Sequence, residues 1–359
     1  MSPLQTQLQA YKRRSDADIE AYATHVRQTT REHYGQYPGV VTDAFFDMLS
    51  RGGKRMRAAL VMVGYEMCGG RDEQMIVRAA TAIEMVHASL LILDDIQDRS
   101  GLRRGKPTVH KMLEAYHKAQ GLKGDAAHTG TSLATNAALT GLHAAQMLVA
   151  GLQADPELRS KASGIIAHAV ITTAHGQTLD FVQEITEATT MDDIEHTMEW
   201  KTANYSILNP LCVGMVLAGA GCEDTDAIRE YALHTGKAFQ ITDDIIGVFG
   251  DEAQTGKSSM DDIREGKRTL LVVHALEHAP EADTAFLRQC LGNISLSKEA
   301  FNRCTRILVQ CGARSYAEGR AEQHIRAALA SLDKVSRPWG SQQVAFLREL
   351  ARQIKHRTA

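Results

Sequence analysis

Apolar residues recur every three or four positions through most of this chain, in long stretches that contain no proline. Clear examples are residues 133–148, 162–178 and 225–243. This spacing is typical of amphipathic α-helices, whereas strand-like alternation and hairpin dipeptides are scarce. The two ends, residues 1–36 and 325–354, show a similar periodicity among many charges and predict helices on the surface. The pattern predicts an all-α protein, a single large helical bundle around a central cavity.

Two of the predicted helices lead into clusters of aspartate. Residues 78–93 are mostly apolar and contain no glycine or proline, and Asp94-Asp95-Ile96-Gln97-Asp98 follows them directly. A second cluster, Asp243-Asp244-Ile245-Ile246-Gly247, closes another apolar run. Carboxylates at a helix C-terminus oppose the macrodipole at a cost of about 0.3–1 kcal/mol each, which a cation would offset. Mg²⁺ bridging carboxylates to substrate phosphates is the commonest such arrangement. For one cluster alone a solvated acidic helix end is an equal alternative, but two clusters favour a polyanion bound through metal.

Positively charged residues surround two glycine turns near the first cluster. The first is Arg51-Gly52-Gly53-Lys54-Arg55-Met56-Arg57, and the second is Arg103-Arg104-Gly105-Lys106. Arginine and lysine are the usual ligands of phosphate oxygens, and glycine lets the backbone approach an anion closely. Either turn alone is better explained as a solvated basic turn. Together with the aspartates they predict a diphosphate site.

Composition agrees with a helical protein and excludes some partners. Hydrophobic residues make up 44% and aromatic residues only 5%, and the chain has only 7 prolines. The formal net charge of −3 gives no reason to expect nucleic-acid binding. Residues 208–221, the most apolar stretch, are too short to span a bilayer, so no transmembrane segment is expected. The 6 cysteines lack zinc spacing and are expected to be reduced thiols in a cytoplasmic protein. No linker divides the chain, so residues 1–359 are expected to form one domain, with a motif-bearing core at about 45–273.

From about Phe45 to Leu271 the chain resembles the trans-isoprenyl diphosphate synthases, the head-to-tail prenyltransferases. Six blocks in the family's order carry this resemblance: GGKRMR (52–57), EMVHASLLILDDIQDRSGLRRGKPTVH (84–110), GQTLD (176–180), KTANYS (201–206), FQITDDIIGVFGD (239–251) and GKSSMDDIREGKRTLLV (256–272). The resemblance implies the isoprenoid synthase fold. It also implies condensation of isopentenyl diphosphate with an allylic diphosphate, by Mg²⁺-assisted ionisation, condensation and proton elimination.

The resemblance also implies roles for individual residues on the side of the allylic diphosphate. The expected Mg²⁺ ligands and their supporting neighbours are Asp94, Asp95, Asp98, Asp243 and Asp244. Roughly three Mg²⁺ per site are implied, with Mn²⁺ as a substitute. The cations expected to neutralise the leaving diphosphate are Arg103, Lys201 and Lys257. Thr202 and Gln240 match positions near the developing allylic cation, and Asp262 and Lys267 fall in a loop that closes over the site.

A second set of residues resembles the pocket for isopentenyl diphosphate. Its members are Gly53, Lys54, Arg57, His87 and Arg104. His87 precedes Asp94 by two helical turns on the same face, although a lone histidine on such a helix is more often a satisfied core residue. Family resemblance further implies a homodimer.

Product length is expected to depend on the helix before the first aspartate cluster. Leu90, Ser89 and Val86 lie below Asp94 on this helix. In the family, a bulky aromatic five residues before the first aspartate stops growth at farnesyl length. Ser89 occupies that position here and predicts an open channel, hence geranylgeranyl diphosphate or longer. A floor is then expected from residues 133–148, where His143 and Met147 are the large side chains.

Several alternatives remain open from sequence. A farnesyl diphosphate synthase is the second choice. A terpene cyclase of the same architecture would lack GGKRMR and line its cavity with aromatics, and a non-catalytic partner subunit would have lost aspartate ligands. Departures from the family pattern include Ala58, where proline is common, and Gly247, where aspartate is common. None of them removes an expected metal ligand.

Overall fold

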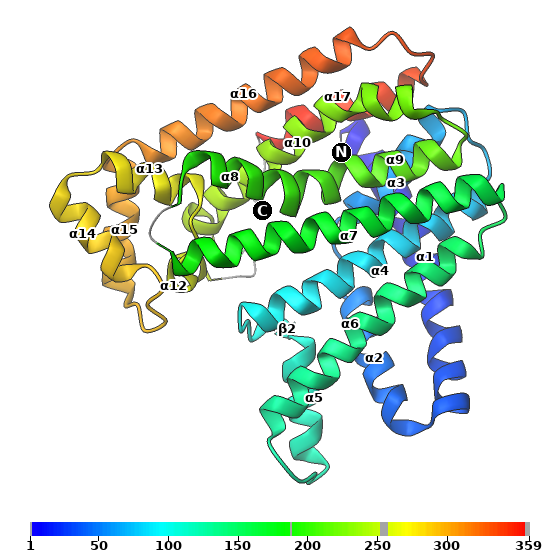
Figure 1. Ribbon diagram of the computed structural model, residues 1–359, viewed down its shortest axis with the longest axis horizontal. Helices are drawn as coiled ribbons and strands as arrows, with labels where there is room; N and C mark the ends of the chain where they lie inside the picture. Colours follow the sequence, from blue (N-terminus) through cyan, green and yellow to red (C-terminus); the bar gives the residue numbers. More distant parts are fainter. Residues whose placement is uncertain (1, 187–188, 252–257, 356–359) are drawn as a thin grey trace. The chain divides into compact units, whose positions relative to one another are not determined.

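The computed structural model describes residues 2–186, 189–251 and 258–355, and these residues are almost entirely helical, as the periodicity predicts (Figure 1). The chain divides into two compact units. Unit 1 comprises Met1–Ile166 and Pro210–Ala220, and unit 2 comprises Ala167–Asn209 and Gly221–Ala359. The expectation of a single domain stays a prediction, and the two units are described separately.

Unit 1 is built on helices from the first half of the chain. Its elements are α1 (Pro3–Tyr34), α2 (Gln36–Ser50), α3 (Met56–Met67), α4 (Glu73–Gln97), β1 (Leu102–Arg103), β2 (Lys106–Pro107), α5 (Val109–Ala119), α6 (Ala126–Ala150), the start of α7 (Pro156–Ile185) and nearly all of α9 (Asn209–Leu217).

Unit 2 contains the rest of α7 and the helices that follow it. These are α8 (Met191–Thr197), the π-helix η1 (Met198–Leu208), α10 (Cys222–Phe249), α12 (Asp261–Glu265), α13 (Leu270–His278), α14 (Glu281–Cys290), α15 (Lys298–Gln310), α16 (Ala313–Lys334) and α17 (Ser341–Ile354).

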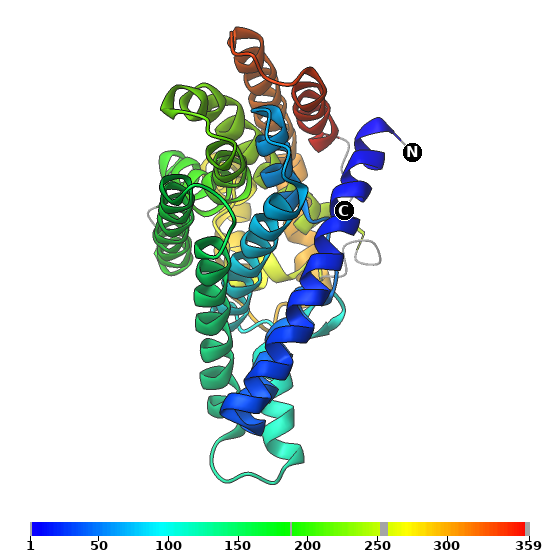
Figure 2. The same ribbon diagram turned by 90° about the vertical axis from the view of Figure 1, so that its right-hand side faces the viewer.

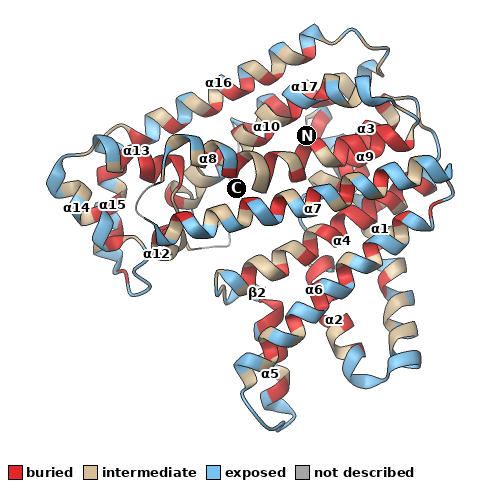
Figure 3. Cartoon of the chain, in the orientation of Figure 1, coloured by how far each residue is buried: buried red, intermediate tan, exposed pale blue. Residues whose placement is uncertain are grey.

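Helix α4 is the core helix of unit 1. It packs against α3 and α6, with α1 and α2 also in contact. Asp72 caps its N-terminus by accepting a hydrogen bond from the Met75 amide at 2.9 Å. By length and composition α4 could cross a membrane, but 72% of its most apolar window is buried in the fold (Figure 3). Burial in a protein core accounts for its apolar character.

Two glycines bring α3 and α9 of unit 1 together. A Cβ atom added at Gly64 would collide with the Leu211 carbonyl, and one added at Gly214 would collide with the Val61 carbonyl. The backbones therefore touch at both crossings. Residues 208–221 are the most apolar stretch of the chain, and α9 within them is buried over most of its length (Figure 3).

The N-terminus folds as one long helix, α1, seen in dark blue in Figure 2. Ser2 and Gln5 form a capping box around its first turn, and Pro3 occupies the first helical position. The phenol of Tyr11 donates a hydrogen bond to Glu66 of α3 at 2.6 Å, and Arg78 of α4 pairs with Asp18 at 3.1 Å. These polar contacts fasten α1 to the core helices.

In unit 2, α10 packs against α16 and against η1. A second hydrophobic core surrounds α13 to α16 and includes Leu271, Leu287, Ile307 and Leu308. The π-helical winding of η1 was not predicted. Helices of this kind are rare and frequently occur at functional sites.

One sequence expectation needs correction. The second aspartate cluster does not close its helix, because α10 continues from Asp243 to Phe249. The C-terminal stretch 325–354 is helical as expected and is divided between α16 and α17. A short hairpin, β1–β2, also occurs at 102–107, where no strand was expected.

Candidate functional site

The basic loop, defined here as residues 51–57, links α2 to α3 and includes the first two residues of α3, and its backbone is unusual. Gly52, Gly53 and Arg55 have φ angles of 88°, 122° and 50°. A residue other than glycine pays a steric cost in this left-handed region. Gly53 also leaves room for the Arg104 guanidinium, whose Nη2 atom would lie 3.0 Å from an added Cβ. The conformation of the loop therefore requires its two glycines and contacts that hold Arg55 in the left-handed region.

Only part of the loop's positive charge faces solvent. Arg51 pairs with Asp47 at 2.7 Å and donates to the Pro107 carbonyl at 2.7 Å, so it supports the β1–β2 hairpin. The side chain of Arg55 is buried. Lys54 is exposed and Arg57 is half-buried, so these two are the accessible cations of the loop.

The β1–β2 hairpin carries Arg103 and Arg104. The pairing of Arg103 with Lys106 makes Arg104 and Gly105 the two central turn residues, and both have positive φ angles of 56° and 72°. Two consecutive positive φ angles are the signature of a type I′ turn. Arg104 donates from Nη1 to the Gly52 carbonyl, which joins the hairpin to the basic loop. The two glycine turns of the sequence are thus brought together in unit 1.

His87 of α4 lies beside the loop. Its Nε2 atom is 3.2 Å from Nη1 of Arg57. Burial, together with the charges of Arg57, Arg104 and Arg103, holds the pKa of His87 well below its usual range. The imidazole is therefore neutral, and since guanidinium only donates, Nε2 accepts. His87 orients Arg57 in this state and adds no charge of its own.

The first aspartate cluster is held by Arg103. Its Nη2 atom lies 3.0 Å from Asp94 Oδ2 and 2.5 Å from Asp95 Oδ1. Asp95 is fully buried, whereas Asp94 and Asp98 are half-buried. The Asp98 amide donates to the Asp94 carbonyl at 2.9 Å, which places the two residues one turn apart as predicted. Asp94 and Asp98 are the members of the cluster that a ligand could reach.

The expected ruler residues lie deeper on α4. Val86 and Ser89 are buried, and Leu90 is half-buried. The Ser89 hydroxyl donates to the Met85 carbonyl at 3.0 Å. A Cβ added to Gly141 of α6 would lie 2.5 Å from this hydroxyl and would also collide with the ring of Phe45 from α2. Phe45 thus supplies an aromatic ring next to Ser89. His143 and Met147, named above as floor candidates, are exposed and do not line this contact.

In unit 2, two glycines set the position of η1. A Cβ added to Gly176 of α7 would collide with the Lys201 backbone, and one added to Gly236 of α10 would collide with Ala203. One turn after each glycine comes a side chain that binds η1. Lys201 pairs with Asp180 at 2.6 Å, and Thr202 donates to Gln240 at 2.6 Å.

The second aspartate cluster continues this polar chain. Gln240 donates from Nε2 to Asp244 Oδ1 at 2.7 Å. Burial raises the pKa of Asp244 well above its usual range, and the carboxylates of Asp262, Asp243 and Asp180 raise it further, against the donation from Gln240. Neighbouring carboxylates disfavour one another's charged form, and an opposite charge nearby would favour it.

The glycine at position 247 has a local explanation. A Cβ at this position would lie 2.5 Å from Oδ2 of Asp262. The Asp262 carboxylate therefore occupies the space that a side chain at position 247 would need. This departure from the family pattern brings a carboxylate from α12 next to the second cluster.

The sequence analysis also named Lys257 and Lys267. Lys267 pairs with Glu265 at 2.9 Å just after α12. Lys257 lies outside the described residues, so its expected role stays a prediction.

The donor chemistry fits Mg²⁺. Within residues 2–186, 189–251 and 258–355, no group of three or more His, Cys, Asp or Glu side chains is assembled as a metal site. Mg²⁺ usually takes one or two carboxylates and completes its octahedron with water and substrate phosphate oxygens. Asp94 with Asp98, and Asp243 with Asp244, provide this kind of donor set. Burial and the neighbouring carboxylates raise the pKa of Asp244, and a divalent cation bound beside it would lower that pKa again.

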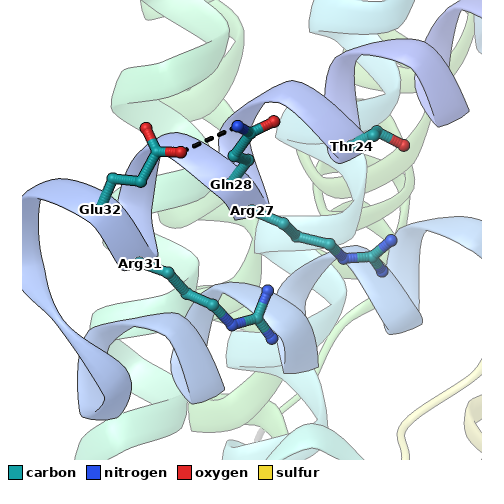
Figure 4. A pocket seen from close by; sticks show the side chains of 5 residues that line it. All are labelled: Thr24, Arg27, Gln28, Arg31 and Glu32. Atoms are coloured by element: carbon teal, nitrogen blue, oxygen red, sulfur yellow. Dashed lines mark hydrogen bonds between the residues drawn. The ribbon is translucent and has the colours of Figure 1, made fainter.

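A shallow depression of about 470 Å³ lies elsewhere, on the exposed face of α1 (Figure 4). It is lined by Thr24, Arg27, Gln28, Arg31 and Glu32. Both arginines are paired with Asp43 of α2, and Gln28 donates to Glu32 at 2.8 Å. Its charges are thus already compensated, and no residue predicted from sequence lines it.

Sequence reasoning missed several residues of these groups. Asp180 closes the GQTLD block but received no role, although it pairs with Lys201. Phe45 and Gly141 gave no signal, because their meeting depends on tertiary packing. The partners of Arg55 were also unforeseen, since Glu84 lies 29 positions away in the chain.

The chain is similar to proteins of a known family. A family model described as polyprenyl synthetase matches residues 39–308. The chain is 32% identical over 293 residues to the geranylgeranyl diphosphate synthase of Saccharolobus solfataricus, covering 82% of this chain and 83% of that protein. It is also 32% identical over 302 residues to the geranylfarnesyl diphosphate synthase of Aeropyrum pernix, covering 83% and 88%.

A solved structure agrees over the whole chain. It is the geranylgeranyl pyrophosphate synthase from Corynebacterium glutamicum, complexed with isoprenyl diphosphate and magnesium. The TM-score is 0.90 at 30% identity, and the match covers 99% of this chain and 100% of that one.

Proposed function

Because the chain belongs to the polyprenyl synthetase family of trans-isoprenyl diphosphate synthases, it is a prenyltransferase, and we propose that it makes geranylgeranyl diphosphate or a longer product. The substrates proposed are isopentenyl diphosphate and an allylic diphosphate. The observation that carries this proposal is the presence of a cationic group in unit 1 in addition to the aspartate pairs. An enzyme that only ionised one diphosphate would have no use for it.

The cationic group is proposed to bind the diphosphate of isopentenyl diphosphate. Lys54 and Arg57 are accessible, and Arg104 is joined to the same loop through Gly52. Arginine forks match phosphate oxygens in pairs, and lysine adds a point charge. Gly53 is proposed to contribute close backbone approach, and neutral His87 to orient Arg57.

The allylic diphosphate is proposed to be held by Asp94, Asp98 and Asp243 through roughly three Mg²⁺, with Asp95 and Asp244 in support and Mn²⁺ as a substitute. Bound metal would neutralise the departing diphosphate. Arg103, Lys201, Lys257 and Lys267 are the proposed side-chain cations for the same anion. Both aspartate clusters are thus proposed to act on one diphosphate.

The reaction proposed is an ionisation followed by a condensation. The allylic C–O bond breaks with its electron pair leaving on diphosphate, and the hydroxyl of Thr202 and the amide oxygen of Gln240 stabilise the allylic cation. The double bond of isopentenyl diphosphate then attacks this cation to form the new C–C bond. Loss of one proton completes the product, and the released diphosphate is the proposed acceptor. Exclusion of water protects the cation from capture.

A C20 or longer product is favoured over farnesyl diphosphate, the alternative. The similar proteins in S. solfataricus and A. pernix carry the names of C20 and C25 synthases. Phe45 beside Ser89 is the observation that speaks for a shorter product. A terpene cyclase is disfavoured by the retained GGKRMR loop, and a non-catalytic subunit by the retained Asp94, Asp98 and Asp243.

The assembly and location of the enzyme are also proposals. A homodimer accords with the family, and a cytoplasmic location accords with the burial of the apolar helix α4 in the fold. Light scattering of the purified protein would measure the oligomeric state, and a monomeric mass would contradict the homodimer.

Incubation with substrates tests the function directly. Purified protein is supplied with Mg²⁺, isopentenyl diphosphate and each of dimethylallyl, geranyl and farnesyl diphosphate. Mass analysis of the dephosphorylated products is expected to show linear alcohols of C20 or longer. A C15 alcohol as the end product would support the farnesyl alternative, and no elongation with any primer would overturn the proposal.

A further inference from the structure

Arg55 of the basic loop is buried and has three hydrogen-bond partners on other elements. Its Nε atom donates to Asp16 of α1 at 2.8 Å, Nη1 to Glu84 of α4 at 3.1 Å, and Nη2 to the Leu49 carbonyl of α2 at 2.7 Å. The side chains of Arg55 and Glu84 are both only 3% exposed. One guanidinium thus joins three helices beneath the loop.

Glu84 fixes the loop a second time. While Oε2 accepts from Arg55, Oε1 accepts the backbone amide of Ala58 at 3.2 Å. Ala58 lies in the first turn of α3, where amides lack partners within the helix and where negative charge is favourable. The Glu84 carboxylate therefore contacts both the side chain of Arg55 and the first turn of α3. Lys54 directly precedes Arg55, and Arg57 directly precedes Ala58.

The backbone of the loop needs such support. Positive φ angles at non-glycine residues carry a steric cost and persist only where the surroundings over-determine them. Arg55 has a φ of 50°, directly between the two accessible cations. A cavity of only about 10 Å³ is lined in part by Arg55, Glu84, His87 and Arg104. Because this is barely the space that one water molecule needs, the anchor packs closely against His87 and Arg104.

Part of the anchor comes from outside the matched family segment. The family model begins at residue 39, whereas Asp16 lies on α1. Asp16 also pairs with Lys12 at 2.7 Å, and the hydrogen bonds from Lys12 and Arg55 outweigh burial to lower its pKa. It is therefore ionised near neutral pH. The N-terminal helix supplies a fixed negative charge to the base of the loop.

We propose that Arg55, Glu84 and Asp16 are positioning residues that hold the loop 51–57 in the conformation that binds the diphosphate of isopentenyl diphosphate. This inference rests on the proposed function. The three residues act through Lys54 and Arg57 and do not themselves touch substrate. Their loss is expected to weaken binding of isopentenyl diphosphate selectively, while the allylic substrate is unaffected.

The sharpest variant replaces both buried charges at once, Arg55→Met with Glu84→Met. Exchange of a buried ion pair for apolar residues of similar volume is often neutral or stabilising, so folding can be retained while the anchor is lost. Net charge is also unchanged, which removes any general electrostatic effect. The KM for isopentenyl diphosphate is expected to rise about tenfold or more, because misplacement by 1 Å can cost 10²-fold. The KM for the allylic substrate is expected to stay within about twofold.

A control uses an ion pair of unit 2, outside α1 and the loop. Arg303 of α15 and Asp283 of α14 are 3.5 Å apart. Arg303→Met with Asp283→Met also removes one positive and one negative charge and is expected to leave both KM values unchanged. A single Asp16→Asn change is expected to raise the KM for isopentenyl diphosphate in the same direction but less.

The single variant Glu84→Gln separates position from charge. Removal of a negative charge beside a phosphate site would by itself tighten anion binding, whereas a loosened loop would weaken it. A raised KM for isopentenyl diphosphate is expected. A lowered KM, or equal changes for both substrates in the double variant, would overturn the proposal.

Direct binding distinguishes this inference from the proposed function. Calorimetric titration with isopentenyl diphosphate, in the absence of an allylic primer, reports the loop alone. If the wild-type protein fails to elongate any primer, the proposed function fails. In that case weaker binding by the anchor variant still supports the positioning role, and equal binding by both proteins refutes it.

Discussion

The protonation state and the hydrogen-bonding role of His87 are set by its neighbours. It was singled out as a lone histidine on an apolar helix, which is more often a core residue than a ligand. The structure places it against Arg57, in a neutral state imposed by burial and by nearby arginines. It therefore serves the cationic group as an acceptor.

The depressed pKa of His87 predicts a dependence of stability on pH. The unfolded chain binds a proton near pH 6.5 and the folded protein binds it only at lower pH. The free energy of unfolding should therefore decrease as the pH falls below about 6.5. The neutral variant His87→Gln lacks this term, so the difference in unfolding free energy between the two proteins should shrink from pH 7.5 to 5.5. Urea unfolding measures it. His143→Gln, at an exposed histidine, is the control, and a constant difference for His87→Gln would contradict the argument.

Thr202 offers a test of the proposed cation stabilisation. Thr202→Val keeps the shape of the side chain but removes the hydroxyl that donates to Gln240 at 2.6 Å. A loss of about 10²-fold in kcat is expected, comparable with removal of one preorganised polar group elsewhere. Thr202→Ser retains the hydroxyl and should keep most of the activity. Steady-state kinetics of both variants decide the matter, and equal activity of the valine and serine variants would exclude a role for this oxygen.

At the scale of elements, η1 is placed by close backbone approaches rather than by large side chains. Gly176 and Gly236 allow α7 and α10 to approach it, and Asp180 and Gln240 follow one turn later. The position of Lys201 and Thr202 is therefore fixed by four residues on two helices.

Substitution of Gly176 by alanine tests this packing. The added methyl would collide with the Lys201 backbone, so a loss of about 1–3 kcal/mol in unfolding free energy and lower activity are expected. Gly319 of α16 has nothing within 4 Å of an added Cβ. There the same change should stabilise the protein by about 0.5–1 kcal/mol through helix propensity. Chemical unfolding measures both, and similar effects at the two sites would contradict the packing argument.

The elements that periodicity could predict are those whose signal lies within one helix. Helices α4, α6 and α7 emerge from their apolar spacing and missing prolines. The hairpin β1–β2 did not, because a two-residue strand leaves no alternation to detect. The winding of η1 has no periodic signal either, since its identity depends on backbone hydrogen bonds one residue longer than usual. Its KTANYS block was found only through family resemblance.

At the scale of the whole molecule, the proposed function predicts a cooperative effect of ligands on stability. A ligand that binds only the folded protein stabilises it by about 2.7 kcal/mol at 100 times its Kd. Mg²⁺ together with inorganic diphosphate should therefore raise the Tm more than either alone, because each completes the other's binding site. EDTA should abolish the effect.

Substitutions in the two clusters extend this test. If both clusters act on one diphosphate, Asp94→Asn and Asp243→Asn should each remove most of the joint shift in Tm. Scanning calorimetry would show it. Retention of the full shift in either variant would mean that its cluster serves a different ligand.

The residues proposed to face the ligands have a signal in the sequence, whereas the residues that support them have none. Aspartates after an apolar helix and arginines around glycine carry chemical meaning in the sequence itself. As basic residues of one turn Arg55 and Arg57 are equivalent, and only the family resemblance singled out Arg57. The structure buries Arg55 between Asp16 and Glu84 and leaves Arg57 half-buried. Which arginine stays accessible to a ligand depends on partners far away in the chain, and no local pattern specifies these partners.

The winding of η1 also restricts how the chain can change in length. At the end of this helix the Asn209 amide reaches back five residues to Asn204. Loss of one residue between Met198 and Leu208 would favour ordinary α-helical winding, in which each position turns by about 100°. Lys201 and Thr202 would then face away from Asp180 and Gln240. Insertions and deletions should therefore be tolerated in exposed turns such as residues 120–125 but rejected within η1, so that its length is preserved among active descendants of this sequence even where its residues are exchanged.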